Sequence, residues 1–366
     1  MGEPLKVGVV GIGTISKAYF EHMAKLSNVK VVAAADLDVA RAKSAADQYS
    51  VRALTPDELY ADDDVDAVLN LTIPAAHASV ALAALNAGKH VYGEKPLAAT
   101  RQEARPLLEV AKQAGLRIGC APDTVLGTGT QTARVLLDRG DIGVPTAATA
   151  FFVSPGPEPW HPDPEFYYKP GGGPLLDMGP YYLSSLVNLL GPVARVTGRV
   201  GRARQERTVG SGPKQGTTFT VEVDTHITGV LEHESGVLTT VVTSFDVWGA
   251  KLPRIEVYGS EGSLSVPDPN TFAGEVAVLS AGSKEWTVAP VSGGYADSGR
   301  GFGLGDMARA IQNGTSHRAN GDLAFHVLDV MESLLESGAK GGAPVEVEST
   351  VERPEAVPEG ATPDVA

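Results

Sequence analysis

Short apolar runs alternate with helix-forming stretches over the first third of the chain. Runs rich in valine, leucine and alanine predict buried strands at 7–10, 29–35, 67–71, 89–92 and 116–121. The intervals between these runs are rich in alanine and suit helices. Strands and helices in alternation predict a parallel, doubly wound sheet.

The pattern changes after about residue 122. A helix is predicted at 129–139, followed by strands at 146–152, 217–227, 237–245 and 254–258, and by late helices at 302–313 and 322–337. Turn signals such as Glu234 to Gly236 between these strands predict a mainly antiparallel sheet. The fold class is therefore α/β, with an N-terminal Rossmann domain and a C-terminal α+β domain.

With 366 residues and 43% hydrophobic residues, the chain is long enough for two cores. We expect a nucleotide-binding domain over 1–123 and a substrate-binding and oligomerisation domain over 124–348. The last helices are able to pack on either domain. Residues 349–366 are rich in proline, glutamate and alanine, which predicts a loose tail.

The net charge of −14 and the pI near 5.0 disfavour nucleic acid and anionic membranes as partners. No apolar run approaches the ~20 residues of a membrane span, and a strand-like run begins at Leu5, which leaves no room for a signal peptide. The single cysteine, Cys120, excludes an internal disulfide. These features favour a cytoplasmic protein. The eight histidines and Cys120 show no metal-ligand spacing, so no metal is expected.

A glycine loop follows the first predicted strand. Gly11 suits a tight turn, and Gly13 lets main-chain amides approach a pyrophosphate at the start of a helix. Ile12, Thr14 and Ile15 complete the loop and are expected to contact the cofactor through their main chain.

The second predicted strand ends at Asp36, at about the distance from the loop where an acid binds the adenosine ribose. Residues 35–38 contain no arginine, and Asp36 would repel a 2′-phosphate, so NAD is favoured over NADP. Asp36 is alternatively a helix cap, although Asp38 is better placed to cap a helix that begins near Val39.

Glu94, Lys95 and Pro96 follow the strand at 89–92, at the edge where open α/β sheets bind ligands. Lys95 is therefore a candidate for the nicotinamide end of the site. The alternative is a solvated charge on a surface turn.

Three motifs resemble the Gfo/Idh/MocA oxidoreductases, and the resemblance covers nearly the whole chain. They are GVVGIGTIS at 8–16, GKHVYGEKPLA at 88–98 and GGGPLLDMGPYYL at 171–183. The resemblance implies that Lys95 lies beside nicotinamide and substrate, that Glu94 is a cofactor-binding residue, and that Asp177 and Tyr181 complete the catalytic site. Most members carry histidine at the position of Tyr181. In having tyrosine there, the chain resembles the branch that contains glucose-fructose oxidoreductase and the dihydrodiol and xylose dehydrogenases.

The chain departs from the family pattern at two places. In the family's Thr-Pro-Asn-x-x-His segment, Thr72 and His77 carry over as cofactor-binding candidates, whereas Ile73 replaces the usual proline. Ser184 stands where a further acid is common.

Oxidation of a secondary alcohol requires a base and a group that holds the developing alkoxide. Asp177 and Tyr181 are four residues apart and share one face of a helix. Lys95 would stabilise the phenolate of Tyr181 and lower its pKa, so we assign Tyr181 as acid/base, Lys95 as its partner and Asp177 as the group that orients substrate hydroxyls. Lys95 itself remains an alternative base. The alternative is a purely structural role, in which Asp177 caps the helix and Tyr181 packs in the core.

An aromatic, proline-rich segment precedes the third motif. Trp160 and Tyr168 are candidates for stacking on a sugar, and His161 and Lys169 for binding hydroxyls or an anionic group. Asp123 is a further substrate-binding candidate. Each of these residues is alternatively part of a packed loop. The arginines at 199, 202, 204 and 207 are expected to form a solvated loop.

The sequence thus favours an NAD-dependent dehydrogenase or reductase of a sugar, a sugar derivative or a cyclic polyol. An alternative is a redox-neutral glycoside hydrolase that oxidises its sugar transiently, and a third is a non-catalytic NAD-binding sensor. A homo-oligomer is expected, because the segment 237–243 is apolar on both faces, and the family resemblance implies a homodimer or homotetramer that uses this sheet.

Overall fold

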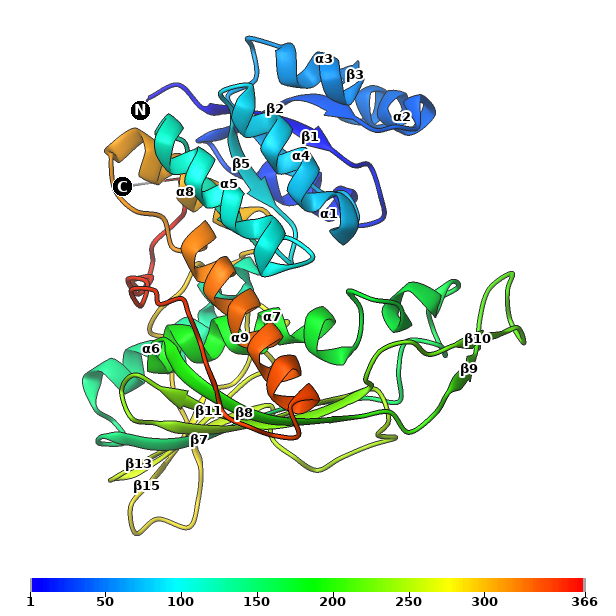
Figure 1. Ribbon diagram of the computed structural model, residues 1–366. Coiled ribbons are helices and arrows are strands. Elements are labelled where there is room, and N and C mark those ends of the chain that lie inside the picture. Colours follow the sequence, from blue (N-terminus) through cyan, green and yellow to red (C-terminus); the bar gives the residue numbers. More distant parts are fainter. Residues whose placement is uncertain (1, 365–366) are drawn as a thin grey trace. The chain divides into compact units, whose positions relative to one another are not determined.

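A computed structural model describes residues 2–364 of a chain that divides into two compact units. Unit 1 comprises Met1–Gln131, Ser292–Phe325 and Pro354–Ala366, and unit 2 comprises Thr132–Val291 and His326–Arg353. Each unit has its own large sheet (Figure 1). The first segment of unit 1 ends at Gln131, beyond the expected boundary at residue 123. The late helix near 302 belongs to unit 1, which is one of the two alternatives that the sequence left open, and the C-terminal segment belongs to unit 1 as well.

Six parallel strands form the sheet of unit 1, in the order β3-β2-β1-β4-β5-β6. They are β1 (Leu5–Val10), β2 (Val29–Ala35), β3 (Arg52–Leu54), β4 (Ala67–Asn70), β5 (His90–Gly93) and β6 (Ile118–Cys120). The strand order reverses between β1 and β4, which is where doubly wound sheets bind ligands. The predicted doubly wound sheet is confirmed.

Helices connect these strands and their ends carry recognisable caps. They are α1 (Ser16–Met23), α2 (Val39–Tyr49), α3 (Pro56–Ala61), α4 (Pro74–Asn86) and α5 (Arg101–Ala114). The Asp38 side chain accepts a hydrogen bond from the amide of Ala40 at the start of α2, so the prediction that Asp38 caps this helix is confirmed. Thr55 and Glu58 form a capping box that begins α3.

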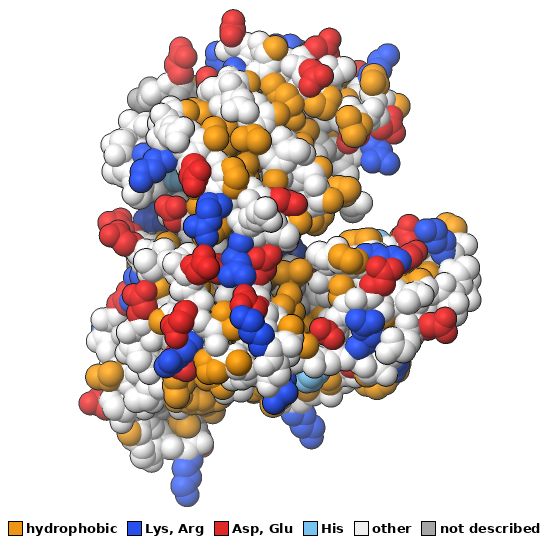
Figure 2. All heavy atoms as spheres, viewed as in Figure 1, with side chains coloured by type: hydrophobic (Ala, Val, Ile, Leu, Met, Phe, Trp, Pro, Cys, Tyr) orange, Lys and Arg blue, Asp and Glu red, His pale blue; other side chains and the backbone are white. Residues whose placement is uncertain are grey.

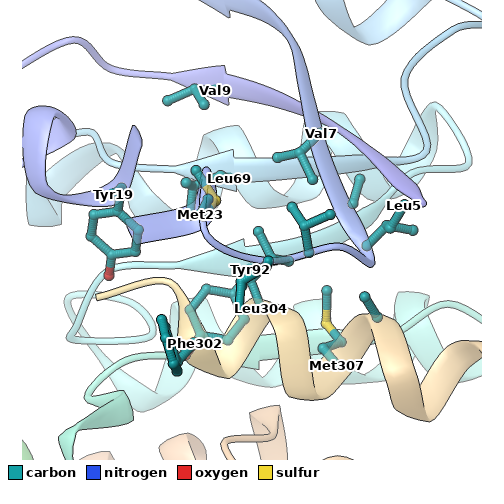
Figure 3. Close-up of a cluster of buried hydrophobic side chains, with 14 of the residues drawn as sticks. Leu5, Val7, Val9, Tyr19, Met23, Leu69, Tyr92, Phe302, Leu304 and Met307 are labelled. Carbon is teal, nitrogen blue, oxygen red and sulfur yellow. The ribbon is translucent and has the colours of Figure 1, made fainter. Parts of the chain in front are cut away.

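A helix from the last quarter of the chain completes the core of unit 1. Helix α8 (Phe302–Asn313) matches its predicted bounds, and its Phe302, Leu304 and Met307 belong to the same buried cluster as Leu5 and Tyr92 (Figure 3). Full burial of a side chain of this size contributes about 1.5–3 kcal/mol. The Rossmann sheet therefore needs residues far beyond the first domain for its hydrophobic cover.

Nine strands form the sheet of unit 2, in the order β16-β15-β14-β13-β7-β12-β11-β8-β17, and only the β7–β12 pair is parallel. The strands are β7 (Pro145–Val153), β8 (Val193–Gly201), β11 (His226–His233), β12 (Leu238–Ser244), β13 (Ile255–Gly259), β14 (Gly262–Val266), β15 (Ala277–Ser280), β16 (Thr287–Val288) and β17 (Val345–Glu346). The predicted mainly antiparallel sheet is confirmed.

Helices lie on one face of this sheet (Figure 1). Helix α7 (Pro174–Leu190) packs on β7, β11 and β12, and Leu334 of α9 (Gly321–Ala339) lies against Gly198 and Gly229 on β8 and β11. Helix α6 (Thr128–Arg139) precedes β7 in the chain, and the short strands β9 (Glu206–Thr208) and β10 (Thr218–Thr220) form a separate hairpin.

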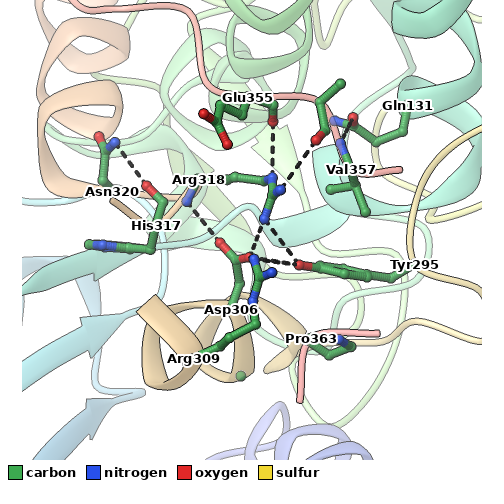
Figure 4. A network of polar contacts seen from close by, with 12 residues as sticks. Gln131, Tyr295, Asp306, Arg309, His317, Arg318, Asn320, Glu355, Val357 and Pro363 are labelled. Atoms are coloured by element: carbon green, nitrogen blue, oxygen red, sulfur yellow. Dashed lines mark hydrogen bonds and ion pairs between the residues drawn. The ribbon is translucent and has the colours of Figure 1, made fainter. Parts of the chain in front are cut away.

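The predicted loose tail is wrong for residues 349–364. In unit 1, the guanidinium of Arg318 donates to the carbonyls of Glu355 and Ala356, and the amide of Val357 donates to Gln131 Oε1 at 2.7 Å (Figure 4). In unit 2, the Ser349 hydroxyl donates to Asp329. Long-range hydrogen bonds fix this segment although its composition is that of a flexible tail. Residues 365 and 366 lie outside the described part.

The surface is mixed in charge. Acidic and basic side chains are interspersed over the face in Figure 2, so the net charge of −14 forms no continuous acidic field on that face. Among the described residues, none of the helices combines the length and the apolarity that crossing a bilayer requires.

Candidate active site

The glycine loop joins β1 to α1 in a tight turn. Gly11 has φ +96°, and a Cβ on it would lie 2.7 Å from the main-chain carbon of Leu71, so only glycine fits there. Gly13 has no atom near its Cβ position, which leaves the loop open on that side. Thr14 is exposed, whereas Ile12 and Ile15 pack partly into the core and anchor the loop.

The carboxylate of Asp36 is fixed at the end of β2. Its Oδ2 accepts from the amide of Ile12 at 2.7 Å, and its Oδ1 accepts from the amide of Asp38 at 2.8 Å. The acid and the glycine loop, which are far apart in sequence, therefore meet at the carboxyl edge of the sheet. A carboxylate still has lone pairs for ribose hydroxyls after accepting two amides.

A cavity of about 530 Å³ lies in unit 1 beside these two elements. It is lined by Val10, Gly11, Gly13, Asp36, Leu37, Arg41, Pro56, Asp57, Tyr60, Leu71, Thr72, Ile73, Ala76, Ser79 and Val80. Four of the predicted cofactor residues are among them: Gly11, Gly13, Asp36 and Thr72. The residues of this lining fit the adenosine half of a dinucleotide, with apolar side chains for the base and an acid for the ribose.

Residues 35–38 contain no arginine, but the structure brings Arg41 to the site of Asp36. The side chain lines the same cavity, and its Nε lies 3.4 Å from Oδ2 of Asp38. The sequence did not reveal Arg41 as a site residue, because only the first helical turn of α2 brings its side chain back beside the end of β2. Tyr60 and Asp57 were missed because they follow β3, a three-residue, mostly exposed strand without an apolar pattern.

His77 holds together two loops of the site. It is buried, and its ring nitrogens lie 3.0 Å from the carbonyl oxygen of Thr72 and 2.6 Å from that of Pro96. Because the ring is enclosed by main chain, the expectation that His77 contacts the cofactor is corrected. The ring ties the loop of Thr72 to the turn that carries Lys95.

Glu94 and Lys95 follow β5 at the carboxyl edge of the same sheet. Glu94 Oε1 accepts from the hydroxyl of Tyr19 at 2.8 Å, and Glu94 Oε2 accepts from the amide of Lys95 at 3.0 Å. The side chain of Lys95 is partly exposed. The carboxylate of Glu94 therefore stabilises the turn that carries Lys95.

Asp123 is not available to a substrate, which corrects its assignment as a candidate ligand. The side chain is fully buried, and its Oδ2 accepts from the amides of Gly301 at 2.7 Å and Gly303 at 3.1 Å, at the start of α8. Burial raises the pKa of Asp123 to about 6, although these amides and Arg300 favour its charged form.

In unit 2, helix α7 carries both remaining catalytic candidates. Gly173 precedes the helix with φ +92° and donates its amide to the carbonyl of Tyr167 at 2.7 Å. Asp177 lies in the first turn and is half-buried, and Tyr181 lies one turn later with 4% of its surface exposed. The spacing that predicted a shared helix face is therefore present.

The glycines before α7 have a structural reason of their own. A Cβ on Gly172 would lie 2.5 Å from the carbonyl oxygen of Tyr167, and one on Gly173 would lie 3.1 Å from that of Asp224. Close approach of the chain's own backbone therefore explains these two glycines, in addition to the predicted approach of cofactor and sugar.

The aromatic segment before them divides into exposed and buried residues. Trp160 is 65% exposed and its ring contacts those of His161 and Tyr167, so it stays a candidate for stacking on a sugar. Lys169 is partly exposed and pairs with Glu165 and Glu222. Tyr168 is completely buried, which excludes the stacking role that the sequence suggested.

Arg207 corrects the prediction of a solvated arginine run. It is buried, and its guanidinium contacts Glu158 Oε1 at 2.7 Å and Asp246 Oδ1 at 2.5 Å. The Tyr168 hydroxyl donates to the other oxygen of Glu158, and its ring lies 5.2 Å from the guanidinium carbon. Desolvation and the Glu158 carboxylate raise the pKa of Tyr168 above its usual value. This cluster anchors the segment that carries Trp160.

Within residues 2–364, no three histidine, cysteine, aspartate or glutamate side chains are grouped as metal ligands would be.

Two family models match the chain. Residues 5–121 match a model described as the NAD-binding Rossmann fold of an oxidoreductase family, and residues 130–265 match the GFO/IDH/MocA C-terminal domain. Together the two matches span more than half of the chain. The prediction of an NAD-binding Rossmann domain is confirmed.

Several characterised proteins are similar to this chain. It is 26% identical to the D-xylose 1-dehydrogenase (NADP(+)) 2 of Haloferax volcanii, over 93% of this chain and 99% of that protein. It is 33% identical to the inositol 2-dehydrogenase of Salmonella paratyphi B, over 45% of this chain and only 51% of that protein. Levoglucosan dehydrogenase in its apo form shares the fold, with a TM-score of 0.81 at 21% identity over 96% of this chain and 100% of that one.

Proposed function

The chain belongs to the Gfo/Idh/MocA family of oxidoreductases, and from this membership we propose that it transfers hydride between NAD and a carbon of a sugar, sugar derivative or cyclic polyol that carries a hydroxyl or carbonyl group. The observation that carries the proposal is the cavity at the carboxyl edge of the unit 1 sheet, with Asp36 fixed beside the glycine loop. The names of the relatives, xylose and inositol dehydrogenases among them, support the substrate class.

NAD is proposed as the cofactor rather than NADP. Asp36 faces the cavity as an acceptor for ribose hydroxyls and would repel a 2′-phosphate, and the charge of Arg41 is offset by Asp38. Glycines 11 and 13, Asp36 and Thr72 would hold the dinucleotide, which supplies a hydride acceptor or donor when bound.

The chain's own residues would transfer the hydroxyl proton of the substrate and orient the substrate. In our proposal the phenolate form of Tyr181, which the ammonium of Lys95 stabilises, accepts the hydroxyl proton of the substrate during oxidation and becomes the neutral phenol. Asp177 accepts hydrogen bonds from neighbouring substrate hydroxyls, which holds one hydroxyl toward Tyr181. Trp160 is proposed to stack on a sugar face.

A substrate screen tests this function. The protein is incubated with NAD and, separately, with aldoses, inositols and glycosides at neutral and alkaline pH, and the absorbance of NADH is followed. Accumulation of NADH with one of these substrates is the expected result.

Two outcomes would replace the proposal. Release of an aglycone from a glycoside without net NADH would indicate the redox-neutral hydrolase. Binding of NAD without turnover of any compound would favour a sensor.

We also propose that the protein is a homodimer or a homotetramer. Leu238 of β12 and Val230 of β11 are 51% and 37% exposed on the outer face of the unit 2 sheet, where a second copy would cover them. Light scattering should give a multiple of the 38.0 kDa chain mass, and a mass near 38.0 kDa at micromolar concentration would exclude this assembly.

A further inference from the structure

The carboxylate of Glu94 is held on three sides. Its Oε1 accepts from the Tyr19 hydroxyl at 2.8 Å and lies 3.7 Å from a guanidinium nitrogen of Arg300, and its Oε2 accepts from the amide of Lys95 at 3.0 Å. Only 12% of the Glu94 side chain and 19% of the Arg300 side chain are exposed. Interactions between charges in such a setting are screened less than on an open surface.

The position of Arg300 is fixed by the segment that carries it. Gly301 and Gly303 donate their amides to the buried carboxylate of Asp123. A Cβ on Gly303 would lie 2.0 Å from the Tyr92 hydroxyl, and one on Gly301 would lie 2.8 Å from the side chain of Met23. The main chain on the C-terminal side of Arg300 therefore packs directly on α1 and β5, against Tyr19 and Tyr92.

We propose that Glu94 is a positioning residue for Lys95, with Tyr19 and Arg300 as its supports: the carboxylate fixes the turn that presents the lysine, and the balance between the charges of Glu94 and Arg300 sets the charge of its amine. The inference rests on the proposed function, in which Lys95 acts in the site. No part of it requires Glu94 to touch the cofactor or the substrate.

The direction of each charge effect follows from Coulomb's law. A carboxylate on the residue next to Lys95 favours the ammonium form, whereas the guanidinium of Arg300, 3.7 Å from that carboxylate, offsets its charge and disfavours the ammonium form. The same effects act on their other neighbours, since burial and Glu94 raise the pKa of Tyr19 and Arg300 lowers it. The charged and titratable groups that surround this turn in unit 1 include Tyr19, His22, His77, Tyr92, Glu94, Cys120, Asp123 and Arg300.

The test measures the amine of Lys95 directly, in the full chain without substrate. The protein is treated briefly with 1-fluoro-2,4-dinitrobenzene across a pH series, and modification of the peptide that contains Lys95 is quantified by mass spectrometry. Only the neutral amine reacts. Glu94→Gln should lower the pH midpoint of modification by about one pH unit, and Arg300→Met should raise it by a similar amount.

A matched control and a conservative variant isolate the effect. Glu109→Gln removes an exposed acid from α5 and should leave the midpoint unchanged. Glu94→Asp keeps the charge and should stay close to the wild-type midpoint. A general loss of structure would move Glu94→Gln and Arg300→Met in the same direction, so opposite shifts separate an electrostatic role from a structural one.

Absent shifts, or shifts of the same sign in the two variants, would overturn the proposal. If Arg300→Met does not fold, equal midpoints for wild type and Glu94→Gln would overturn it as well. Turnover of Lys95→Ala tests the proposed function separately: an active Lys95→Ala enzyme would remove Lys95 from the mechanism and leave the measured midpoints as they are.

Discussion

The carboxylate of Asp36 and the amide of Ile12 form a 2.7 Å hydrogen bond that joins the end of β2 to the turn after β1. A second hydrogen bond, from the amide of Asp38, holds the other carboxylate oxygen. The orientation of the acid is therefore set by the protein itself. A preorganised acceptor loses less conformational freedom when a ligand binds.

Asp36→Ser should narrow the preference for NAD over NADP. The serine cannot repel a 2′-phosphate, and it loses a charge-assisted hydrogen bond to ribose that contributes about 1–3 kcal/mol. Isothermal titration calorimetry with NAD and, separately, with NADP measures both affinities. The NAD Kd should rise by roughly tenfold or more, which corresponds to about 1.4 kcal/mol.

Asp47→Ser is the matched control, since Asp47 is exposed on α2. Tighter binding of NADP than of NAD by the wild-type protein would contradict the cofactor assignment. In that case Arg41, which lines the same cavity, would be the residue to examine.

Asp123→Asn should change how the stability of α8 depends on pH. Burial raises the pKa of Asp123 from 3.8 to about 6 in the folded state. Between these values the folded protein binds more protons than the unfolded one, so its stability falls as the pH rises from about 4 to about 6, by roughly 3 kcal/mol, and is constant above that range.

The asparagine variant lacks this titration. Hydrogen exchange at the α8 amides measures the free energy of local opening. In the variant this free energy should not fall between about pH 4 and pH 6, as it does in the wild type. Parallel profiles for the two proteins would show that Asp123 keeps an ordinary pKa in the folded state.

Periodicity and spacing were sufficient for five of the six strands of unit 1 and for β7, β12 and β13 of unit 2. The predicted strand at 217–227 is instead divided between β10 and the start of β11, and β8 was not predicted. Buried strands such as β1 and β4 carry continuous apolar runs, and α8 carries its apolar face at helical spacing, so each could be predicted locally. Strand β3 has no such pattern because it is short and mostly exposed. The ordered segment 349–364 depends on partners such as Gln131 and Asp329, which no local pattern reveals.

Candidate site residues were predictable where main-chain geometry dictates the residue type. Gly11 and Asp36 are of this kind, since a tight turn and a strand end place them. Asp123 and Tyr168 carry polar groups that suit a binding site, and Arg207 was expected in a solvated loop, yet all three are buried. Whether a polar side chain faces a cavity or the interior depends on tertiary packing, so the sequence supplied candidates that only the structure could separate.

Arg207→Met should destabilise unit 2. Removal of the guanidinium leaves the carboxylates of Glu158 and Asp246 buried without their cation, a change that typically costs about 3–5 kcal/mol. All three tryptophans, Trp160, Trp248 and Trp286, lie in unit 2, so urea unfolding followed by tryptophan fluorescence reports on this unit. Arg204→Met, at an exposed position nearby, should change the midpoint little. Equal midpoints for both variants would show that the buried cluster contributes little to stability.

Tyr181→Phe should retain the fold and the affinity for NAD while lowering kcat by roughly 10² or more, which is the scale of a lost general acid or base. The side chain is buried, and the substitution removes only its hydroxyl, so the packing of α7 is nearly preserved. Steady-state kinetics on the substrate found in the screen, with NAD titrations as the control for binding, give the measurement. Near-normal turnover would assign the tyrosine to the core of unit 2.

Lys95→Ala should cost at least as much as Tyr181→Phe. If both residues act on one proton, the double variant should lose much less than the product of the two single losses. Normal turnover in Tyr181→Phe beside an inactive Lys95→Ala would identify the lysine as the base. The pH profile gives an independent check, because a tyrosine base requires an oxidation rate that rises with a midpoint below about pH 10. A flat profile in that range, with a substrate deuterium isotope effect showing that hydride transfer limits the rate, would exclude a titrating base at Tyr181.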